Sequence, residues 1–135
     1  MIAIDTNVVV RILTADDPGQ LEAARRALRS RPLFLSKSVL LETAWVLRYS
    51  YQHNRQEIGD ALNNLIRYRQ MEVEDLPAVM EALAWFSGGM DFADALHLAS
   101  SRNVDRFVTF DRELATTAKS LGCAPEVELL RQTTR

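Results

Sequence analysis

The sequence predicts an α/β domain in which a parallel sheet is covered by helices on both faces. Short apolar runs typical of strands alternate with longer segments that carry apolar residues at helical spacing. Parallel strands need crossover connections, so this alternation favours a doubly wound arrangement. Neither a repeat nor a linker divides the 135 residues, and this length suits one domain. We therefore expect a single domain spanning residues 1–135.

The strand predictions rest on short apolar runs bounded by turn residues or acids. Two of these runs lead directly into an aspartate, and the others lie between helical segments. The expected strands are Ile2–Asp5, Leu33–Leu35, Met71–Val73, Arg106–Phe110 and Glu126–Leu130.

Capping residues mark where the helices begin and end. Asn54 with Glu57 resembles a capping box, in which each residue satisfies a backbone N–H of the other. The other expected helix starts are Asp17-Pro18, Ser36–Ser38, Asp75 with Pro77, Asp91 and Asp111, and the expected ends include Pro32, Gly88-Gly89, Arg102 and Gly122.

The apolar residues of these helices recur at helical spacing, which predicts the faces that pack on the sheet. The small residues of the helix after Asp91 would allow a close approach to the sheet. The apolar sets are Leu21, Ala24 and Leu28; Val39, Leu40, Trp45, Val46 and Tyr49; Ile58, Leu62, Leu65 and Ile66; Val79, Leu83 and Phe86; Phe92, Ala93, Ala95, Leu96, Leu98 and Ala99; Leu114, Ala118 and Leu121.

Composition limits the range of functions. The net charge of −2 counts against a broad cationic surface for nucleic acid, so any such role is expected to be local. The densest basic stretch, residues 25–31, fits a solvated helix face and an RNA contact equally well. The single cysteine, Cys123, excludes an intrachain disulfide and is expected to be a small buried hydrophobe. No targeting or membrane-spanning segment is evident, so a cytoplasmic protein is expected.

Two predicted strands run directly into aspartates, Asp5 and Asp111, and ligands of doubly wound sheets bind beyond the carboxyl ends of the strands. A single aspartate at such a place is usually a turn or cap residue. Two of them at the same predicted edge favour a functional site.

Three further acids lie in apolar surroundings near helix starts. Glu42 either interacts favourably with its helix N-terminus or belongs to the site. Asp91 and Asp94 are three residues apart and share one helix face. A capping role suits Asp91, which leaves Asp94 as the better candidate ligand.

Carboxylates that are forced together repel one another, and a bound cation relieves this repulsion. Oxygen ligands without a histidine or cysteine cluster favour Mg²⁺, Mn²⁺ or Ca²⁺ over Zn²⁺. The two histidines, His53 and His97, are isolated in the sequence and are expected to be structural.

Taken together, these motifs resemble the PIN domain family, and within it the VapC-type toxins of bacterial toxin–antitoxin pairs. The resemblance covers essentially the whole chain. It rests on four motifs in this order: Ile4-Asp5-Thr6-Asn7, Glu42 after a serine-rich turn, Asp91–Ala99, and Val108-Thr109-Phe110-Asp111.

This resemblance implies a PIN-like three-layer α/β/α domain with a central parallel sheet. It also implies a metal-dependent endoribonuclease that uses Mg²⁺ or Mn²⁺ and forms no covalent intermediate. A homodimer and a VapB-type antitoxin, whose tail occupies the active-site groove, are expected as well. The implied metal ligands are Asp5, Glu42, Asp94 and Asp111, and the implied auxiliary residues are Thr6, Asn7, Asp91 and Thr109.

Two alternatives remain at this point. Phosphatases of the haloacid-dehalogenase type and receiver domains also place aspartates at strand ends. They usually begin with two acids separated by one residue, however, whereas Asp5 is followed by Thr6 and Asn7, and neither lysine follows a convincing apolar strand. The second alternative is a non-catalytic PIN-like binding module, against which the intact set of acids argues.

Overall fold

The computed structural model describes residues 1–132 and divides the chain into two compact units, Met1–Leu76 and the part from Pro77 onward. We call them the N-terminal and the C-terminal unit and describe each by itself. Among the described residues, no helix is long and apolar enough to cross a membrane.

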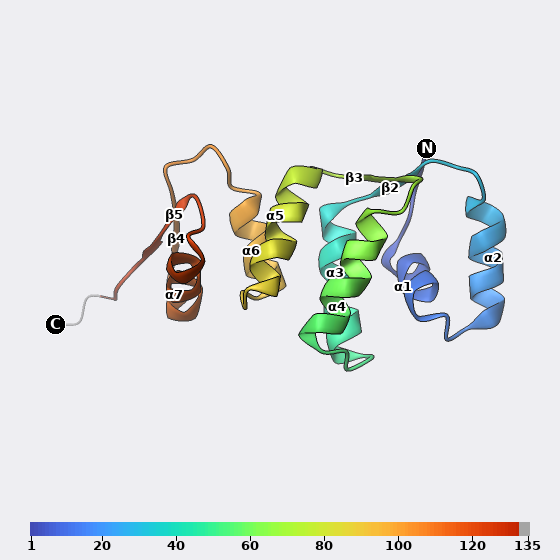
Figure 1. Ribbon diagram of the computed structural model, residues 1–135, viewed down its shortest axis with the longest axis horizontal. Coiled ribbons are helices and arrows are strands. Elements are labelled where there is room, and N and C mark those ends of the chain that lie inside the picture. Colours follow the sequence, from blue (N-terminus) through green and yellow to red (C-terminus); the bar gives the residue numbers. More distant parts are fainter. Residues whose placement is uncertain (133–135) are drawn as a thin grey trace. The chain divides into compact units, whose positions relative to one another are not determined.

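The N-terminal unit is built on a three-stranded sheet in the order β1-β2-β3. All its strands are parallel, with Ile2 paired to Leu33 and Leu33 paired to Met71. Its elements are β1 (Ile2–Ala3), α1 (Thr6–Thr14), α2 (Pro18–Leu28), β2 (Leu33–Leu35), α3 (Lys37–Tyr49), α4 (Arg55–Ile66) and β3 (Met71–Val73) (Figure 1).

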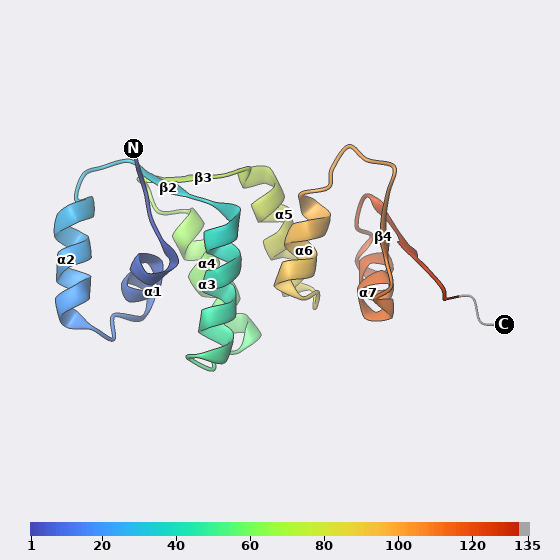
Figure 2. The same ribbon diagram turned by 180° about the vertical axis from the view of Figure 1, so that it is seen from behind.

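The core of this unit lies between the sheet and helices α1, α3 and α4. Helix α1 packs on α3 and also on α2, which lies beside it in Figure 2, and α3 packs on α4. Each of these helices except α2 contributes buried apolar side chains. The buried hydrophobic residues are Ile4, Val9, Val10, Leu33, Leu35, Leu40, Ala44, Leu47, Ile58, Leu62, Leu65 and Val73.

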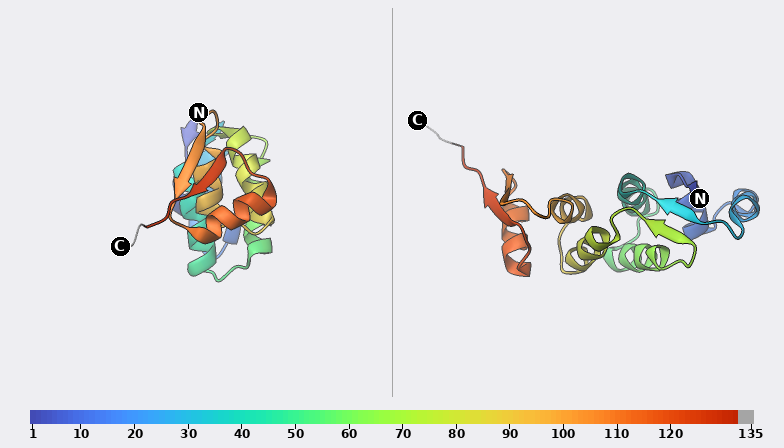
Figure 3. Two further views of the ribbon diagram at one scale, coloured as in Figure 1. Left: turned by 90° about the vertical axis from the view of Figure 1, so that its left-hand side faces the viewer. Right: turned by 90° about the horizontal axis from the view of Figure 1, so that it is seen from above.

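The C-terminal unit contains a two-stranded parallel sheet, in which β4 pairs with β5. The two strands lie side by side in the left-hand view of Figure 3. Helix α7 packs on both of them. The elements of this unit are α5 (Leu76–Ser87, which starts at the boundary residue), α6 (Phe92–Ala99), β4 (Arg106–Thr109), α7 (Arg112–Leu121) and β5 (Glu126–Leu129).

The α/β fold with parallel strands is confirmed, and every predicted strand exists with ends within two residues of the prediction. The strands are distributed over a three-stranded and a two-stranded sheet, one in each unit. The capping box of Asn54 and Glu57 is present. Asp17, Ser36 and Asp111 also cap their helices through their side chains.

Two features of the N-terminal unit differ from the expectation. The sequence pattern does not predict α1, because its run of valines at residues 8–10 has low helix propensity, which packing on α3 and α2 overrides. In α3 the buried residues include Leu40 and Leu47, whereas Trp45 and Tyr49, predicted as part of its apolar set, are exposed.

Candidate active site

Asp5 is the N-cap of α1 and lies two residues beyond the end of β1. Its backbone carbonyl accepts hydrogen bonds from the N–H groups of Val8 and Val9, both at 3.1 Å. The carboxylate is exposed and makes no capping hydrogen bond. Because the turn is closed by backbone atoms, capping leaves the carboxylate of Asp5 available for a ligand.

Glu42 lies in the second turn of α3 and is tied to the start of α1 by its neighbour Thr6. The Thr6 hydroxyl donates a hydrogen bond of 2.5 Å to Oε1 of Glu42. Thr6 is buried and Glu42 is exposed, so a fixed hydroxyl orients a carboxylate that faces solvent. Asn7 is exposed in the first turn of α1. The structure therefore brings together Thr6 and Glu42, two of the residues that the sequence singles out.

Asp91 and Asp94 lie at the start of α6 and differ in their roles. The carboxylate of Asp91 caps the helix by accepting a hydrogen bond of 3.2 Å from the N–H of Asp94. This confirms the capping role predicted for Asp91. The Asp94 side chain is partly buried in the first turn of α6.

The surroundings of Asp94 disfavour its charged form. Partial burial is the main cause that raises the pKa of Asp94 above its usual 3.8, and the negative charges of Asp91, Asp111 and Glu113 raise it further. His97 acts in the opposite direction. A carboxylate in such surroundings is stabilised by a cation, which would offset both the burial and the repulsion.

Asp111 is the N-cap of α7 and lies two residues beyond the end of β4. One of its carboxylate oxygens, Oδ1, accepts hydrogen bonds from the N–H groups of Glu113 at 3.0 Å and Leu114 at 3.2 Å. The N–H of Asp111 donates to Oγ1 of Thr109 at 3.0 Å. The side-chain hydroxyl of Thr109 thus holds the backbone of Asp111 in position.

The chemistry of these side chains fits a hard divalent cation, because the candidate ligands are carboxylate oxygens. Within residues 1–132, however, no three histidine, cysteine or acidic side chains lie together in an arrangement that could hold a metal ion. Asp5 and Glu42 belong to the N-terminal unit, and Asp94 and Asp111 belong to the C-terminal unit. The set of four metal ligands therefore stays a prediction.

Comparison with known proteins identifies the family of this chain. The family model of the PIN domain matches residues 2–120. This chain belongs to the PIN domain family. Among solved structures, the PIN chain is similar to the crystal structure of Mycobacterium tuberculosis VapC20, described as a Sarcin-Ricin loop cleaving toxin. The match has 23% sequence identity and a TM-score of 0.42, and it covers 92% of this chain and 97% of that chain. A search of curated proteins finds no match.

The matched PIN region also contains an acid that the sequence interpretation missed. Glu113 lies in the first turn of α7 and contributes to the negative potential at Asp94. Its position two residues after Asp111 was a usable signal, because acids in a first helical turn gather near an N-cap.

Cys123 is only partly buried, and that burial raises the pKa of its thiol.

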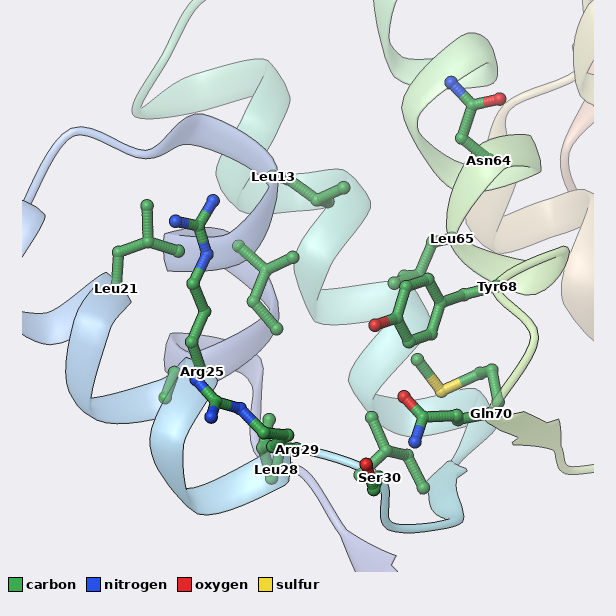
Figure 4. Close-up of a pocket in the computed structure, with 14 residues that line it drawn as sticks. Leu13, Leu21, Arg25, Leu28, Arg29, Ser30, Asn64, Leu65, Tyr68 and Gln70 are labelled. Atoms are coloured by element: carbon green, nitrogen blue, oxygen red, sulfur yellow. The ribbon is translucent and has the colours of Figure 1, made fainter.

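A hollow in the N-terminal unit of this PIN chain is lined by none of the four candidate acids. It has a volume of about 690 Å³ and is lined by leucines of α1 and α2, the end of α4 and the starts of β2 and β3. Figure 4 shows the side chains of Arg25 and Arg29 beside this apolar lining. The predicted face of α2, which includes Leu21 and Leu28, faces this groove and is therefore only partly buried. We refer to it as the α1–α2–α4 groove.

Proposed function

We propose that this PIN chain is a metal-dependent endoribonuclease and acts as the toxin of a toxin–antitoxin pair. The observation that carries the proposal is the family match over residues 2–120, which contains all four candidate acids. Asp5, Asp94 and Asp111 lie at a helix N-cap or in the first turn of a helix, where the helix dipole favours negative charge. Glu42 lies in the second turn of α3. The two units would then form the single PIN domain that the sequence predicts.

In this proposal Asp5, Glu42, Asp94 and Asp111 hold Mg²⁺ or Mn²⁺. When bound, the metal polarises the phosphodiester, lowers the pKa of a water molecule and stabilises the leaving oxygen. Thr6 keeps the Glu42 carboxylate oriented, and Thr109 keeps Asp111 in place. Asn7 and Asp91 are auxiliary residues at the two helix starts. Since water is the attacking group, no side chain forms a covalent bond to the RNA.

Cleavage of a mixed RNA pool tests this function. Wild-type protein should produce new RNA ends with Mg²⁺ or Mn²⁺ and none with a chelator. Asp5→Asn is the matched control, because it removes a charge that makes no capping hydrogen bond. Equal cleavage by wild type and variant would exclude Asp5 from the site. RNA binding without any metal-dependent cleavage would favour the non-catalytic binding module.

The toxin role requires a protein partner that restrains the enzyme. The α1–α2–α4 groove offers apolar side chains next to Arg25 and Arg29. The expected antitoxin tail would occupy the active-site groove, and this second surface would hold another antitoxin segment with apolar residues and flanking acids, because its charges complement the arginines. Co-purification with the product of an adjacent small reading frame tests the pair. Recovery of only the free protein at full activity would contradict the toxin–antitoxin assignment but not the nuclease assignment.

We further propose a homodimer that acts in the cytoplasm. Light scattering of the purified protein tests the dimer, for which the measured mass should be about twice that of the monomer. Fractionation of expressing cells tests the location. Mapping the ends of cellular RNAs after brief expression would identify the RNA target.

A further inference from the structure

Helix α3 has an outer face with two large aromatic side chains that pack into no core. Trp45 is 59% exposed and Tyr49 is 56% exposed. The opposite face of the same helix is buried and includes Leu40, Thr43 and Leu47. Because both rings stay largely in water, they contribute little hydrophobic free energy to folding. The stability of the fold therefore does not explain why two such large side chains stand here.

These two rings share a helix face with a candidate site residue. Glu42, Trp45 and Tyr49 are spaced by three and then four residues, which places their side chains along one side of the helix. With a rise of about 1.5 Å per residue, Trp45 lies about 4.5 Å and Tyr49 about 10.5 Å along the axis from Glu42. We call this row of three side chains the α3 ladder.

The rings of the ladder are held in relation to each other and to a cation. Their centroids are 5.1 Å apart, and their planes are tilted by 47°. The guanidinium carbon of Arg48 lies 5.1 Å from the centroid of the Tyr49 ring. The two rings and the neighbouring Arg48 therefore combine exposed aromatic surface with a positive charge, the combination that binds single-stranded nucleic acid by stacking and cation–π contacts.

We propose that the α3 ladder binds single-stranded RNA, with bases next to the cleaved phosphate stacking on Trp45 and Tyr49. This inference rests on the proposed nuclease function, because it places the aromatic pair on the side of α3 that carries Glu42. It assigns substrate binding to two residues that have no part in holding the metal. Stacking accepts every base, so the ladder would hold the RNA strand without selecting its sequence.

The immediate surroundings of the rings favour RNA over a second copy of the chain. The other exposed residues of α3 are polar or charged: Ser38 and Glu42 on the face of the rings, and Arg48 at its edge beside Tyr49. The buried core of a stable protein interface is a continuous apolar patch with few charges. Two rings flanked by an acid and an arginine do not form such a patch.

Fluorescence allows a direct test, because the chain has only two tryptophans. Trp85 is 8% exposed, whereas Trp45 is 59% exposed. A mixed-sequence, single-stranded RNA oligonucleotide is titrated into wild-type protein in chelator, where no cleavage interferes. We expect quenching of the tryptophan emission, since a base stacked on Trp45 contacts its ring. Anisotropy of labelled oligonucleotide gives the affinity independently of the tryptophan.

The variants separate the rings from general effects on the protein. Trp45→Ala and Tyr49→Ala should each weaken RNA binding at least about fivefold, the lower end of the effect of losing one stacked base. Trp45→Phe and Tyr49→Phe keep an aromatic face and should restore most of the affinity. Met80→Ala is the control, because Met80 is a large side chain that is 56% exposed and has no part in the proposed site or groove. It should leave RNA binding unchanged.

Cleavage with Mn²⁺ distinguishes failure of this inference from failure of the proposed function. If wild type cleaves RNA, the alanine variants of the ladder should raise KM far more than they lower kcat. If both alanine variants cleave RNA with unchanged affinity and KM, the proposed RNA binding by the ladder is wrong and the proposed nuclease function stands. RNA binding that depends on Trp45 without any cleavage would support the ladder and overturn the nuclease. Loss of a dimer in Trp45→Ala with unchanged RNA affinity would assign the rings to an interface between copies and overturn the proposal.

Discussion

Helices α1 and α7 both begin at an aspartate two residues beyond a strand, yet the two aspartates cap their helices differently. At α1 the backbone carbonyl of Asp5 closes the turn, and its carboxylate makes no capping hydrogen bond. At α7 the carboxylate of Asp111 accepts two backbone N–H groups. The same sequence pattern therefore gives a carboxylate unused by capping at one helix and a bound one at the other.

This difference shows that capping and ligand binding need not exclude each other. Both hydrogen bonds to Asp111 use Oδ1, so Oδ2 is not needed for the cap. A carboxylate can cap a helix through one oxygen and offer the other to a cation, since each oxygen has its own lone pairs. The predictions below separate the two roles, starting with the largest effect.

The largest effect is expected in α6, where the capping acid and the candidate ligand are different residues. Asp94→Asn should lower RNA cleavage by more than the about 10- to 100-fold typical of losing an outer partner of a metal site. Asp91→Asn should keep a measurable fraction of the activity, because asparagine caps helices as well as aspartate does. Cleavage rates of both purified variants with saturating Mn²⁺ provide the measurement.

His97→Ala is the control for this pair. His97 is exposed and lowers the pKa of Asp94 through its charge, and we expect the variant to keep most of its activity. Equal and complete loss in Asp91→Asn and Asp94→Asn would contradict the division of roles. A collapse in the rate of a folded His97→Ala protein would show that the histidine takes part in the reaction.

Metal binding should stabilise wild type more than a variant that lacks the Asp5 carboxylate, which makes no capping hydrogen bond. A ligand that binds only the native state stabilises it by about 2.7 kcal/mol at a hundredfold excess over Kd, which corresponds to several degrees in Tm. Asp5→Asn loses one ligand charge and should show a smaller shift. Melting curves with chelator and with millimolar Mn²⁺ measure both shifts. Identical shifts would mean that Asp5 does not contact the metal.

The sequence predicted the strands and most helix caps because these features depend on local residues. Asn54 with Glu57 forms the expected capping box, and Asp91 caps α6 as expected. Helix α1 was not predictable in this way, because its valines disfavour a helix and packing on α3 and α2 overrides that preference. The exposure of Trp45 was also hidden, since an apolar pattern does not reveal which face lacks a partner.

In the candidate site, too, the features that depend on local residues were predictable and those that depend on contacts between elements were not. The choice of acids followed from their positions near strand and helix ends and from the family resemblance, and all four lie in the matched PIN region. The hydroxyl of Thr6 on Glu42 and the raised pKa of Asp94 depend on side chains from separate elements. Such long-range contacts leave no periodic signal in a sequence, so only the structure could show them.

A smaller effect is expected on local stability at the two capped helices. Asp111→Ala removes two hydrogen bonds to backbone N–H groups and should cost about 1 kcal/mol, which lets the first turn of α7 open more often. Asp5→Ala removes no such bond and should cost less at α1. Hydrogen exchange of the amides at Leu114 and at Val9, measured in chelator, compares the two turns. Equal losses of protection would contradict the distinction between the two caps.

The smallest effect concerns the pH dependence of stability without metal, and it follows from the environment of Asp94. Burial and the nearby acids raise the pKa of Asp94 in the folded state above its usual 3.8, so the folded protein binds this proton more tightly than the unfolded chain does. Its charged form therefore destabilises the fold. This penalty is absent below about the unfolded pKa and grows as the pH rises through the folded pKa.

Asp94→Asn removes the penalty, because its side chain stays neutral at every pH. In chelator the variant should therefore melt at a higher temperature than wild type at neutral pH. The difference should shrink as the pH falls and vanish below 3.8, where Asp94 is protonated in both the folded and the unfolded state. Asp105→Asn, in the exposed turn before β4, controls for the general loss of one negative charge. A variant that is less stable than wild type at pH 7, or a difference that does not vary with pH, would show that the native fold favours the charged form of Asp94 even without a cation.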